Sequence, residues 1–242
     1  MGRFDDRVAL VTGAGGGIGR ATVERLTSEG ARVVGVDLDE DAARAAGGAL
    51  ALRCDVADPD SCAEAVATTV ERLGGLHILA NIAGVGSFAS TRELSLDDWN
   101  RTLAVNLTGT FLMSQAALDP LLETGGAIVN MASVSGLRAL PYNAAYTASK
   151  GGVVMLTKAM AVEFGRAGLR VNCVCPSSVD TDFLRGFEYP ADVDLSLFAL
   201  RASIIQRAAT PAEIAGVVAF LASDDAAMVT GAAWAVDGGA TA

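Results

Sequence analysis

The sequence predicts an α/β fold, a doubly wound and mostly parallel seven-stranded sheet in a single domain. Seven short runs rich in β-branched residues alternate with longer helical patterns almost from end to end. Strands that are separated by helical crossovers must run parallel, with helices covering both faces of the sheet. The length of 242 residues and the apolar content of 51% supply one large core and exclude a disordered chain.

The strands are expected where the β-branched runs lie, and the helices between them. The expected strands are 7–12, 31–37, 49–55, 76–82, 126–133, 169–175 and 232–236. The expected helices are 17–29, 59–73, 97–118, 144–166 and 211–222, with a short one at 39–46. Two helix starts carry signals of their own, since Asp58 precedes Pro59 and Thr210-Pro-Ala-Glu213 forms a capping box.

One stretch, residues 180–209, has no clear pattern and is rich in aromatic residues. It contains Phe183, Phe187, Tyr189, Pro190 and Phe198. It follows the carboxyl end of the sixth expected strand, where ligands bind in such sheets. The sequence leaves two interpretations open, a small substrate lid within the single domain 1–242 or an ordinary surface excursion.

Charge and composition exclude several classes of protein. The formal net charge is −10, from 18 basic and 28 acidic residues, so a nucleic-acid backbone would be repelled. No apolar run spans a membrane and the first residues lack a secretory pattern, so we expect a cytoplasmic protein. The four cysteines lack metal-ligand spacing, and the single histidine, His77, indicates a structural role and no multi-histidine metal site.

A glycine-rich loop joins the first expected strand to the first expected helix. The run Thr12-Gly13 to Gly17-Ile18-Gly19 fits T-G-x3-G-I-G, although the strict G-x-G-x-x-G register fails. Glycines let main-chain N–H groups approach a phosphate, and the helix N-terminus adds positive potential. Strand, glycines, helix and a second strand ending in an acid follow in order, so we expect a Rossmann-type dinucleotide site.

Asp37 ends the second expected strand and predicts the choice of dinucleotide. Its carboxylate can accept hydrogen bonds from both adenosine ribose hydroxyls. It would repel a 2′-phosphate, and neither Gly16 nor Leu38, which flank the expected ribose pocket, offers a compensating cation. The sequence therefore predicts NAD as the cofactor and disfavours NADP.

A tyrosine and a lysine lie one helical turn apart at the start of a long apolar helix. The spacing of Tyr146 and Lys150 sets both side chains on one face. A nearby cation favours the phenolate, so Lys150 is expected to lower the pKa of Tyr146 and make it a usable acid/base. Tyr142 competes for this role but lies farther from Lys150, and Tyr189 has no such neighbour.

The expected strand 126–133 ends in a serine beside the place where a nicotinamide would lie. Ser133 can donate a hydrogen bond to a substrate oxygen and hold it near Tyr146. Ser135 is the rival for this role.

Taken together, these motifs resemble the classical subfamily of the short-chain dehydrogenase/reductase (SDR) family, including its 3-oxoacyl-carrier-protein reductase-like members, over nearly the whole chain. The matching elements are Thr12-Gly13 with Gly17-Ile18-Gly19, Asp55-Val56, Asn81-Ile82-Ala83-Gly84, Asn106, Ser133, Tyr146 with Lys150, Pro176, Thr181 and Val236-Asp237-Gly238-Gly239. The spacing S-x12-Y of that family selects Ser133 over Ser135.

The resemblance implies a role for each matching residue. Tyr146 would exchange the proton, Ser133 would orient the substrate oxygen, and Lys150 would also bind the nicotinamide ribose. Further implied roles are a water held by Asn106, adenine contacts from Asp55 and Val56, and carboxamide contacts from Val179 and Thr181. Asn81 would brace the central strand near the cofactor, and Asn81 and Ala83 are both expected among the cofactor-binding residues. Two departures are Ile82, where the family has a second asparagine, and Ser177, where it has glycine after Pro176.

The residues and the resemblance together predict an NAD-dependent oxidoreductase that interconverts a secondary alcohol and a ketone by hydride transfer. The apolar stretch 180–209 favours a small-molecule substrate with a hydrophobic portion. The alternatives are a 3-oxoacyl-carrier-protein reductase proper, which Asp37 argues against, and a non-catalytic dinucleotide-binding regulator. A nucleotide-sugar epimerase of the extended family would need a longer chain. The resemblance also implies a homotetramer built on helices near 97–118 and 144–166.

Overall fold

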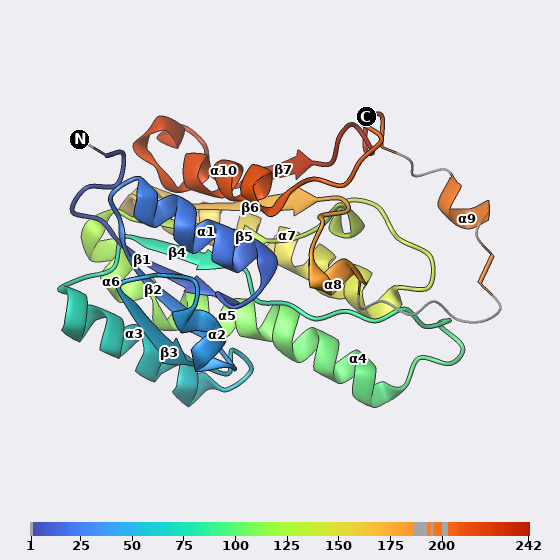
Figure 1. Ribbon diagram of the computed structural model, residues 1–242, viewed down its shortest axis with the longest axis horizontal. Helices are drawn as coiled ribbons and strands as arrows, with labels where there is room; N and C mark the ends of the chain where they lie inside the picture. The colour runs from blue at the N-terminus through green and yellow to red at the C-terminus, as the bar shows by residue number, and fades with distance from the viewer. Residues whose placement is uncertain (1, 186–192, 195, 200–202) are drawn as a thin grey trace.

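The structure, a computed structural model, contains a seven-stranded sheet in the order β3-β2-β1-β4-β5-β6-β7, and every neighbouring pair is parallel (Figure 1). It describes residues 2–185, 193–194, 196–199 and 203–242. The strands are β1 (Val8–Thr12), β2 (Arg32–Asp37), β3 (Leu50–Arg53), β4 (Ile78–Asn81), β5 (Ala127–Met131), β6 (Arg170–Pro176) and β7 (Ala233–Val236). This order confirms the doubly wound sheet, with the chain reversing direction across the sheet between β3 and β4.

Helices cover both faces of the sheet (Figure 1). They are α1 (Gly17–Ser28), α2 (Glu40–Arg44), α3 (Pro59–Leu73), α4 (Leu96–Leu103), α5 (Gly109–Ala116), α6 (Leu118–Thr124), α7 (Ala144–Phe164), α8 (Asp182–Arg185), α9 (Ser196–Ala199) and α10 (Pro211–Ala222). The two expected helix starts are confirmed, because Asp58 caps α3 and Thr210 forms a reciprocal capping box with Glu213 on α10. No helix in the described ranges is long and apolar enough to span a membrane.

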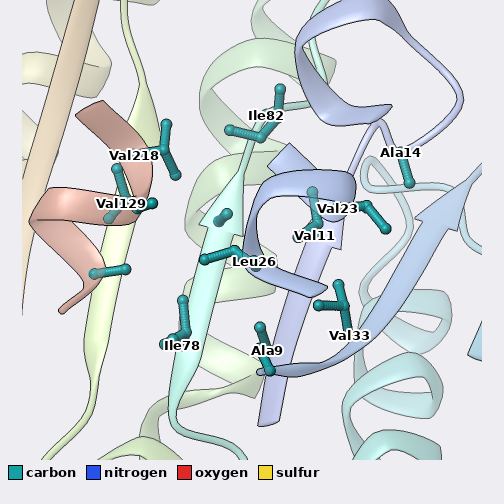
Figure 2. Packing of buried hydrophobic residues seen from close by; sticks show 14 of the residues in the cluster. Ala9, Val11, Ala14, Val23, Leu26, Val33, Ile78, Ile82, Val129 and Val218 are labelled. Atoms are coloured by element: carbon teal, nitrogen blue, oxygen red, sulfur yellow. The ribbon is translucent and has the colours of Figure 1, made fainter. Parts of the chain in front are cut away.

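The hydrophobic core lies in two layers, one on each face of the sheet. Side chains of α1 and α10, such as Leu26 and Val218, cover Ile78 and Val129 on one face (Figure 2). The other layer joins the opposite face to residues of α3, α5, α6 and α7. Strands buried on both faces read as continuous apolar runs, which is why the sequence located them within a few residues.

The expected helix 97–118 differs from the structure. It consists of α4, a π-helical turn over Ala104–Thr108, and α5, and it is followed by α6, which the sequence did not predict. The π turn inserts one extra residue in the helix around Asn106. The segment contains weak helix formers, Val105, Asn106, Thr108 and Gly109, but weak helix propensity does not distinguish a π turn from an ordinary helix.

Candidate active site

A cavity of about 610 Å³ opens at the carboxyl ends of the strands. The glycine loop and Asp37 line one end of it, and Ser133, Tyr146 and Lys150 line the other. Of the predicted site residues, those that line it are Gly13, Gly17, Ile18, Gly19, Asp37, Leu38, Asp55, Val56, Ala83, Ser133, Tyr146, Lys150, Val179 and Thr181. The structure thus gathers at one site residues that are spread from β1 to α8.

The glycine loop forms a cradle with free main-chain donors. Gly13 has a left-handed backbone (φ +65°), and a Cβ on Gly19 would overlap the carbonyl oxygen of Gly13. Helix α1 begins at Gly17, has no capping side chain and has no acidic residue in its first turn. Its first N–H groups therefore have no partner within the helix, and the positive end of its dipole faces the cavity, which fits a dinucleotide pyrophosphate.

Asp37 is tied to the glycine loop by its own carboxylate. Its Oδ2 accepts a hydrogen bond from the Gly15 N–H at 3.0 Å, and its Oδ1 accepts one from the Asp39 N–H at 3.2 Å. These bonds hold the carboxylate at the cavity wall beside Leu38. Each carboxylate oxygen keeps acceptor capacity for a further hydrogen bond, as a ribose diol requires.

Tyr146 lies in the first turn of α7 and faces Ser133, which follows β5. A hydrogen bond joins the phenol and the Ser133 hydroxyl, and the same serine oxygen accepts the Ser135 N–H at 3.1 Å. The Lys150 ammonium lies 5.6 Å from the centre of the Tyr146 ring and donates to the Met131 carbonyl oxygen at 2.7 Å. The expected grouping of phenol, hydroxyl and ammonium is present.

The predicted direction of the Tyr146 pKa shift is wrong for this structure. Burial raises the pKa of Tyr146 to about 12, and the hydrogen bond to Ser133 only partly opposes it. Burial also lowers the pKa of Lys150 to about 8. The spacing correctly placed the cation near the phenol, but desolvation outweighs that attraction because both groups are removed from water.

Two predicted residues, Asn81 and Asn106, do not line the cavity. The Asn81 amide donates to Ser114 Oγ and to Asn130 Oδ1, both at 2.9 Å, so it braces β4 against α5 and β5. The expectation that Asn81 contacts the cofactor directly has no counterpart in this geometry, because Asn81 does not line the cavity and its NH2 group is engaged by Ser114 and Asn130. The bracing role that the resemblance implied remains.

Asn106 lies in the π turn, behind the segment that follows β4. Its side chain pairs with both main-chain groups of Val85 at 2.8 Å and donates to Ser149 Oγ at 3.0 Å. A Cβ on Gly84 would lie 3.2 Å from Asn106 Oδ1 and 3.4 Å from Lys150 Nζ. The amide and the ammonium therefore both border the space that a side chain at Gly84 would fill.

Tyr142 and Ser135, the alternatives to Tyr146 and Ser133, do not belong to the group of side chains around Lys150. The Tyr142 hydroxyl accepts a hydrogen bond from the Asp194 N–H at 3.0 Å, and its ring stacks on Phe198. Ser135 lines the cavity, but it is Ser133 that bonds to Tyr146. His77, just before β4, accepts a hydrogen bond from the N–H of Val8, the first residue of β1, as a structural role requires.

The two departures from the family pattern have simple structural outcomes. Ile82 is buried in the core layer under α1, where an apolar side chain packs without a polar partner (Figure 2). Ser177 lines the cavity, and its N–H donates to the Val236 carbonyl oxygen at 3.3 Å. The loop after β6 thus continues the hydrogen bonding toward β7, although it lacks the usual glycine.

Sequence reasoning missed several residues that line the wall around Tyr146. They are Phe88, Arg138, Leu140 and Asn143. All four follow the carboxyl end of β4 or β5, the edge of the sheet where ligands bind, and that position is the signal that could have found them. Leu184 and Ser203 also line the cavity and belong to the stretch 180–209, for which a substrate lid was one of the two interpretations. From that stretch, Phe183 and Phe198 do line the cavity, whereas Phe187, Tyr189 and Pro190 lie outside the described residues.

Comparisons with known proteins agree with this geometry. A family model described as "Enoyl-(Acyl carrier protein) reductase" matches residues 13–241. Meso-2,3-butanediol dehydrogenase of Serratia marcescens is 44% identical over 99% of this chain and 96% of its own length. D-threitol dehydrogenase of Mycolicibacterium smegmatis is also 44% identical, over 99% and 94%. The chain belongs to the short-chain dehydrogenase/reductase family.

A solved structure supports the assignment of fold and cofactor class. The crystal structure of 3-ketoacyl-(acyl-carrier-protein) reductase from Brucella melitensis, complexed with NADH, is similar to the structure of this chain. It is 32% identical, with a TM-score of 0.90 over 99% of this chain and 100% of that one. This chain, as a member of the short-chain dehydrogenase/reductase family, is therefore an oxidoreductase that acts on CH–OH groups with a nicotinamide dinucleotide. The prediction of alcohol–ketone interconversion is confirmed.

Proposed function

We propose that this enzyme uses NAD to oxidise a secondary alcohol, with Tyr146 as the group that exchanges the hydroxyl proton. The carrying observation is that Tyr146, Ser133 and Lys150 meet at one wall of the cavity while Asp37 stands at its other end. The nicotinamide, when bound, supplies the hydride chemistry. The chain itself supplies orientation and proton transfer.

Three side chains share the work at the reacting carbon. The Ser133 hydroxyl, held by Tyr146 and by the Ser135 N–H, orients the substrate oxygen. Tyr146 accepts the proton from that oxygen during oxidation in its phenolate form and, as the phenol, gives the proton back during reduction. Lys150 is a cation at neutral pH because its pKa is about 8, and its charge favours the phenolate from which oxidation begins.

The remaining site residues hold the cofactor and the proton path. The N-terminus of α1, with Gly17, Ile18 and Gly19, binds the pyrophosphate. Asp55 and Val56 contact the adenine, and Val179 and Thr181 contact the carboxamide. Asn106 holds a water that links Lys150 to solvent, which is supported by the fact that its amide and the ammonium both border the space beside Gly84.

Asp37 is the basis for choosing NAD over NADP. Its carboxylate is fixed by two N–H groups, so it cannot turn away from a 2′-phosphate without losing both bonds. Leu38 beside it carries no charge to offset the repulsion.

The substrate we infer has a hydrophobic portion. Phe183 packs against Tyr146 with ring centres 6.3 Å apart, and Phe88 and Phe198 continue the apolar wall. The described residues of the stretch 180–209 that line the cavity, among them Phe183, Leu184 and Phe198, support the interpretation of that stretch as a substrate lid. Reduction of 3-oxoacyl-carrier-protein substrates is a second candidate function. The Brucella melitensis reductase named for a substrate of this kind has NADH bound, so an NAD-type site does not argue against it.

We also infer a cytoplasmic homotetramer. Large apolar side chains are exposed on α5 and α7, among them Phe111, Met155 and Val162, and Met228 and Trp234 are exposed near the C-terminal strand. Exposed apolar patches of this kind mark protein interfaces, and two separate patches fit a tetramer with two kinds of contact.

Replacing Tyr146 by phenylalanine tests the proposed reaction. We expect Tyr146→Phe to lower kcat for NAD-dependent alcohol oxidation by about 10³-fold or more, because the proton acceptor is lost while the ring remains. NADH binding, followed by nicotinamide fluorescence, stays within about threefold. Tyr142→Phe is the matched control and loses less than about tenfold. Substantial turnover in Tyr146→Phe, or equal loss in both variants, contradicts the proposal.

A further inference from the structure

A buried serine, Ser149, joins the helix α7 to Asn106. Its side chain is fully buried, at 0% exposure, and it lies one position before Lys150. Its hydroxyl donates to the Tyr146 carbonyl oxygen at 2.8 Å and accepts a hydrogen bond from the Asn106 side-chain nitrogen at 3.0 Å. Ser149 does not line the cavity, so any effect that it has on the reaction must pass through another residue.

The two bonds of Ser149 determine which atom of the Asn106 amide faces it. A hydroxyl has one proton, and the main-chain oxygen of Tyr146 can only accept a hydrogen bond. The Ser149 proton therefore goes to Tyr146, and only lone pairs of the serine oxygen remain for Asn106. The amide must present its NH2 group to the serine, which directs its oxygen Oδ1 to the other side.

The other bonds of the Asn106 amide go to the segment that follows β4. Its Nδ2 donates to the Val85 carbonyl oxygen and its Oδ1 accepts the Val85 N–H, both at 2.8 Å. Both amide protons are thus used, whereas Oδ1 keeps one acceptor site. Of these three bonds, only the one to Ser149 reaches α7. Ser149 thus ties the amide to the helix that carries Tyr146 and Lys150.

The remaining acceptor site of the amide oxygen lies near the Lys150 ammonium. Asn106 Oδ1 and Lys150 Nζ both border the space beside Gly84, at 3.2 and 3.4 Å from the position that a Cβ there would take. An oxygen in this place stabilises the charged form of the lysine, because an acceptor is favourable near a cation and a donor is not. A rotated amide would instead direct its NH2 group toward this space.

We propose that Ser149 is a positioning residue of the reaction, which holds the first turn of α7 to Asn106 and keeps the amide oxygen facing the space beside the Lys150 ammonium. The inference rests on the proposed function, in which Lys150 supports the Tyr146 phenolate. A serine hydroxyl that bonds to a main-chain oxygen one turn back is common in helices. Ser149 differs in its second bond, which goes to a buried amide of the site.

The same helix contains a matched pair of bonds away from the site. Thr157 is fully buried, donates to the Val153 carbonyl oxygen at 2.8 Å and accepts a hydrogen bond from the Asn130 side-chain nitrogen at 3.0 Å. It lies about two helical turns beyond Lys150 and does not line the cavity. Loss of its hydroxyl leaves a buried amide proton unpaired, as loss of the Ser149 hydroxyl does. Thr157→Val is therefore the control for the structural cost of Ser149→Ala.

A kinetic comparison of these variants tests the inference. The probe is whichever of butan-2-ol, butane-2,3-diol and cyclohexanol the wild type oxidises fastest with NAD. We expect Ser149→Ala to lower kcat by about tenfold, because the Asn106 amide and the Lys150 ammonium lose their fixed relation. KM for NAD stays within about threefold, since the dinucleotide contacts are unchanged. Ser149→Cys, with a weaker donor and acceptor, falls between Ser149→Ala and the wild type. Thr157→Val lowers Tm as Ser149→Ala does, but its kcat stays within about twofold.

A double-mutant cycle shows whether Ser149 acts through Asn106. We expect Ser149→Ala to lower kcat by less than about twofold when Asn106→Ala is already present, because the link then has nothing to hold. A full additional loss in that background overturns the inference. It is also overturned if kcat of Ser149→Ala stays within about twofold of the wild type, or if Thr157→Val loses as much kcat as Ser149→Ala.

A second readout needs no turnover, so it separates this inference from the proposed function. The chain has two lysines, Lys150 and Lys158, so labelling lysine with carbon-13 gives two Cε signals in NMR spectra, and Lys158→Arg assigns them. Titration of the Lys150 signal then gives the pKa of its ammonium. Among the described residues, the titratable groups that face it are Tyr146 on α7 and the thiols of Cys173 and Cys175 on β6. Ser149→Ala replaces none of these groups.

The expected change in the pKa of Lys150 follows from the loss of a fixed acceptor. We expect this pKa to fall by about 0.5 in Ser149→Ala and to stay unchanged in Thr157→Val, because the amide oxygen no longer stabilises the ammonium. An unchanged pKa in Ser149→Ala overturns the inference, whether or not an alcohol is oxidised. If the wild type oxidises none of the three alcohols, the proposed function is contradicted, and the titration alone decides on the role of Ser149.

Discussion

The Lys150 ammonium donates to the main-chain oxygen of Met131, the last residue of β5, at 2.7 Å. This bond anchors the lysine to the strand two residues before Ser133 and keeps its charge beside the Tyr146 ring. The cation is almost fully buried, at 3% exposure, and no carboxylate is paired with it in the described part of the chain. The charge that serves the reaction therefore weakens the fold.

The cost of burying Lys150 should appear in the pH dependence of stability. Its pKa is lowered from 10.5 to about 8, so between these values the unfolded chain holds the proton more tightly than the folded one. The contribution of Lys150 to the free energy of unfolding therefore rises with pH across this window, by about 3 kcal/mol in total. We expect the free energy of unfolding of the wild type, minus that of Lys150→Met, to increase as the pH is raised from about 8 to 10.5. Urea unfolding of both proteins measures this difference.

The difference between the two proteins is the quantity to measure, because buried thiols titrate in the same range. A hydrogen bond with Cys54, together with burial, raises the pKa of Cys62, and a hydrogen bond with Cys173, together with burial, raises the pKa of Cys175. The contribution of these thiols to stability therefore falls as pH rises, but it falls in both proteins. The control is Lys158→Met, which removes the only other lysine, an exposed one. A difference that stays flat with pH for Lys150→Met contradicts the prediction.

Cofactor choice gives a second prediction, centred on Asp37. We expect the wild type to prefer NAD over NADP by about 100-fold or more in kcat/KM, because the fixed carboxylate repels a 2′-phosphate. Combining Asp37→Ala with Leu38→Arg removes the repulsion and adds a cation, so the preference falls by about 100-fold. Initial rates at varied concentrations of each dinucleotide give the ratio.

The control for this prediction is a neighbouring acid that does not line the cavity. Asp41→Asn removes a charge of the same sign from the start of α2, and we expect the NAD to NADP ratio to stay within about threefold. If the wild type turns over both dinucleotides equally well, or if Asp41→Asn shifts the ratio as far as the Asp37 variant, Asp37 does not set the choice.

The parts of the site that the sequence predicted are those encoded by spacing along one element. Tyr146 and Lys150 share a helix face, and the glycines share one loop, so each group is visible as a local pattern. Arg138 and Asn143 were missed because they line a cavity that only the folded chain forms. The sign of the Tyr146 pKa shift was missed for the same reason, since burial is a property of the tertiary structure.

The fold shows the same division. Strands buried on both faces were located from their apolar runs, and capped helices from Asp58 and Thr210. The π turn at Asn106 was not predicted from the sequence, because it depends on how α4 and α5 pack against the rest of the chain. A sequence pattern thus predicts elements well and the irregularities within them poorly.

A stability prediction concerns Arg170, at the start of β6. Its guanidinium donates to the carbonyl oxygens of Leu221, Ala222 and Ser223 at 2.7, 3.3 and 2.9 Å. These carbonyls lie at the C-terminus of α10, where they have no partner within the helix and where a cation is favoured. We expect Arg170→Ala to lower the free energy of unfolding by about 2 kcal/mol, measured by urea unfolding.

The comparison with an exposed arginine isolates the effect of capping α10. Arg44 pairs with Glu40 and Asp41 on the surface of α2, and its side chain is 61% exposed. Because water screens such pairs, Arg44→Ala should cost less than about 1 kcal/mol. Arg170→Lys should fall between the two, since an ammonium keeps the charge but cannot reach three carbonyls with a planar fork. Equal losses for Arg170→Ala and Arg44→Ala would show that Arg170 contributes nothing as a helix cap.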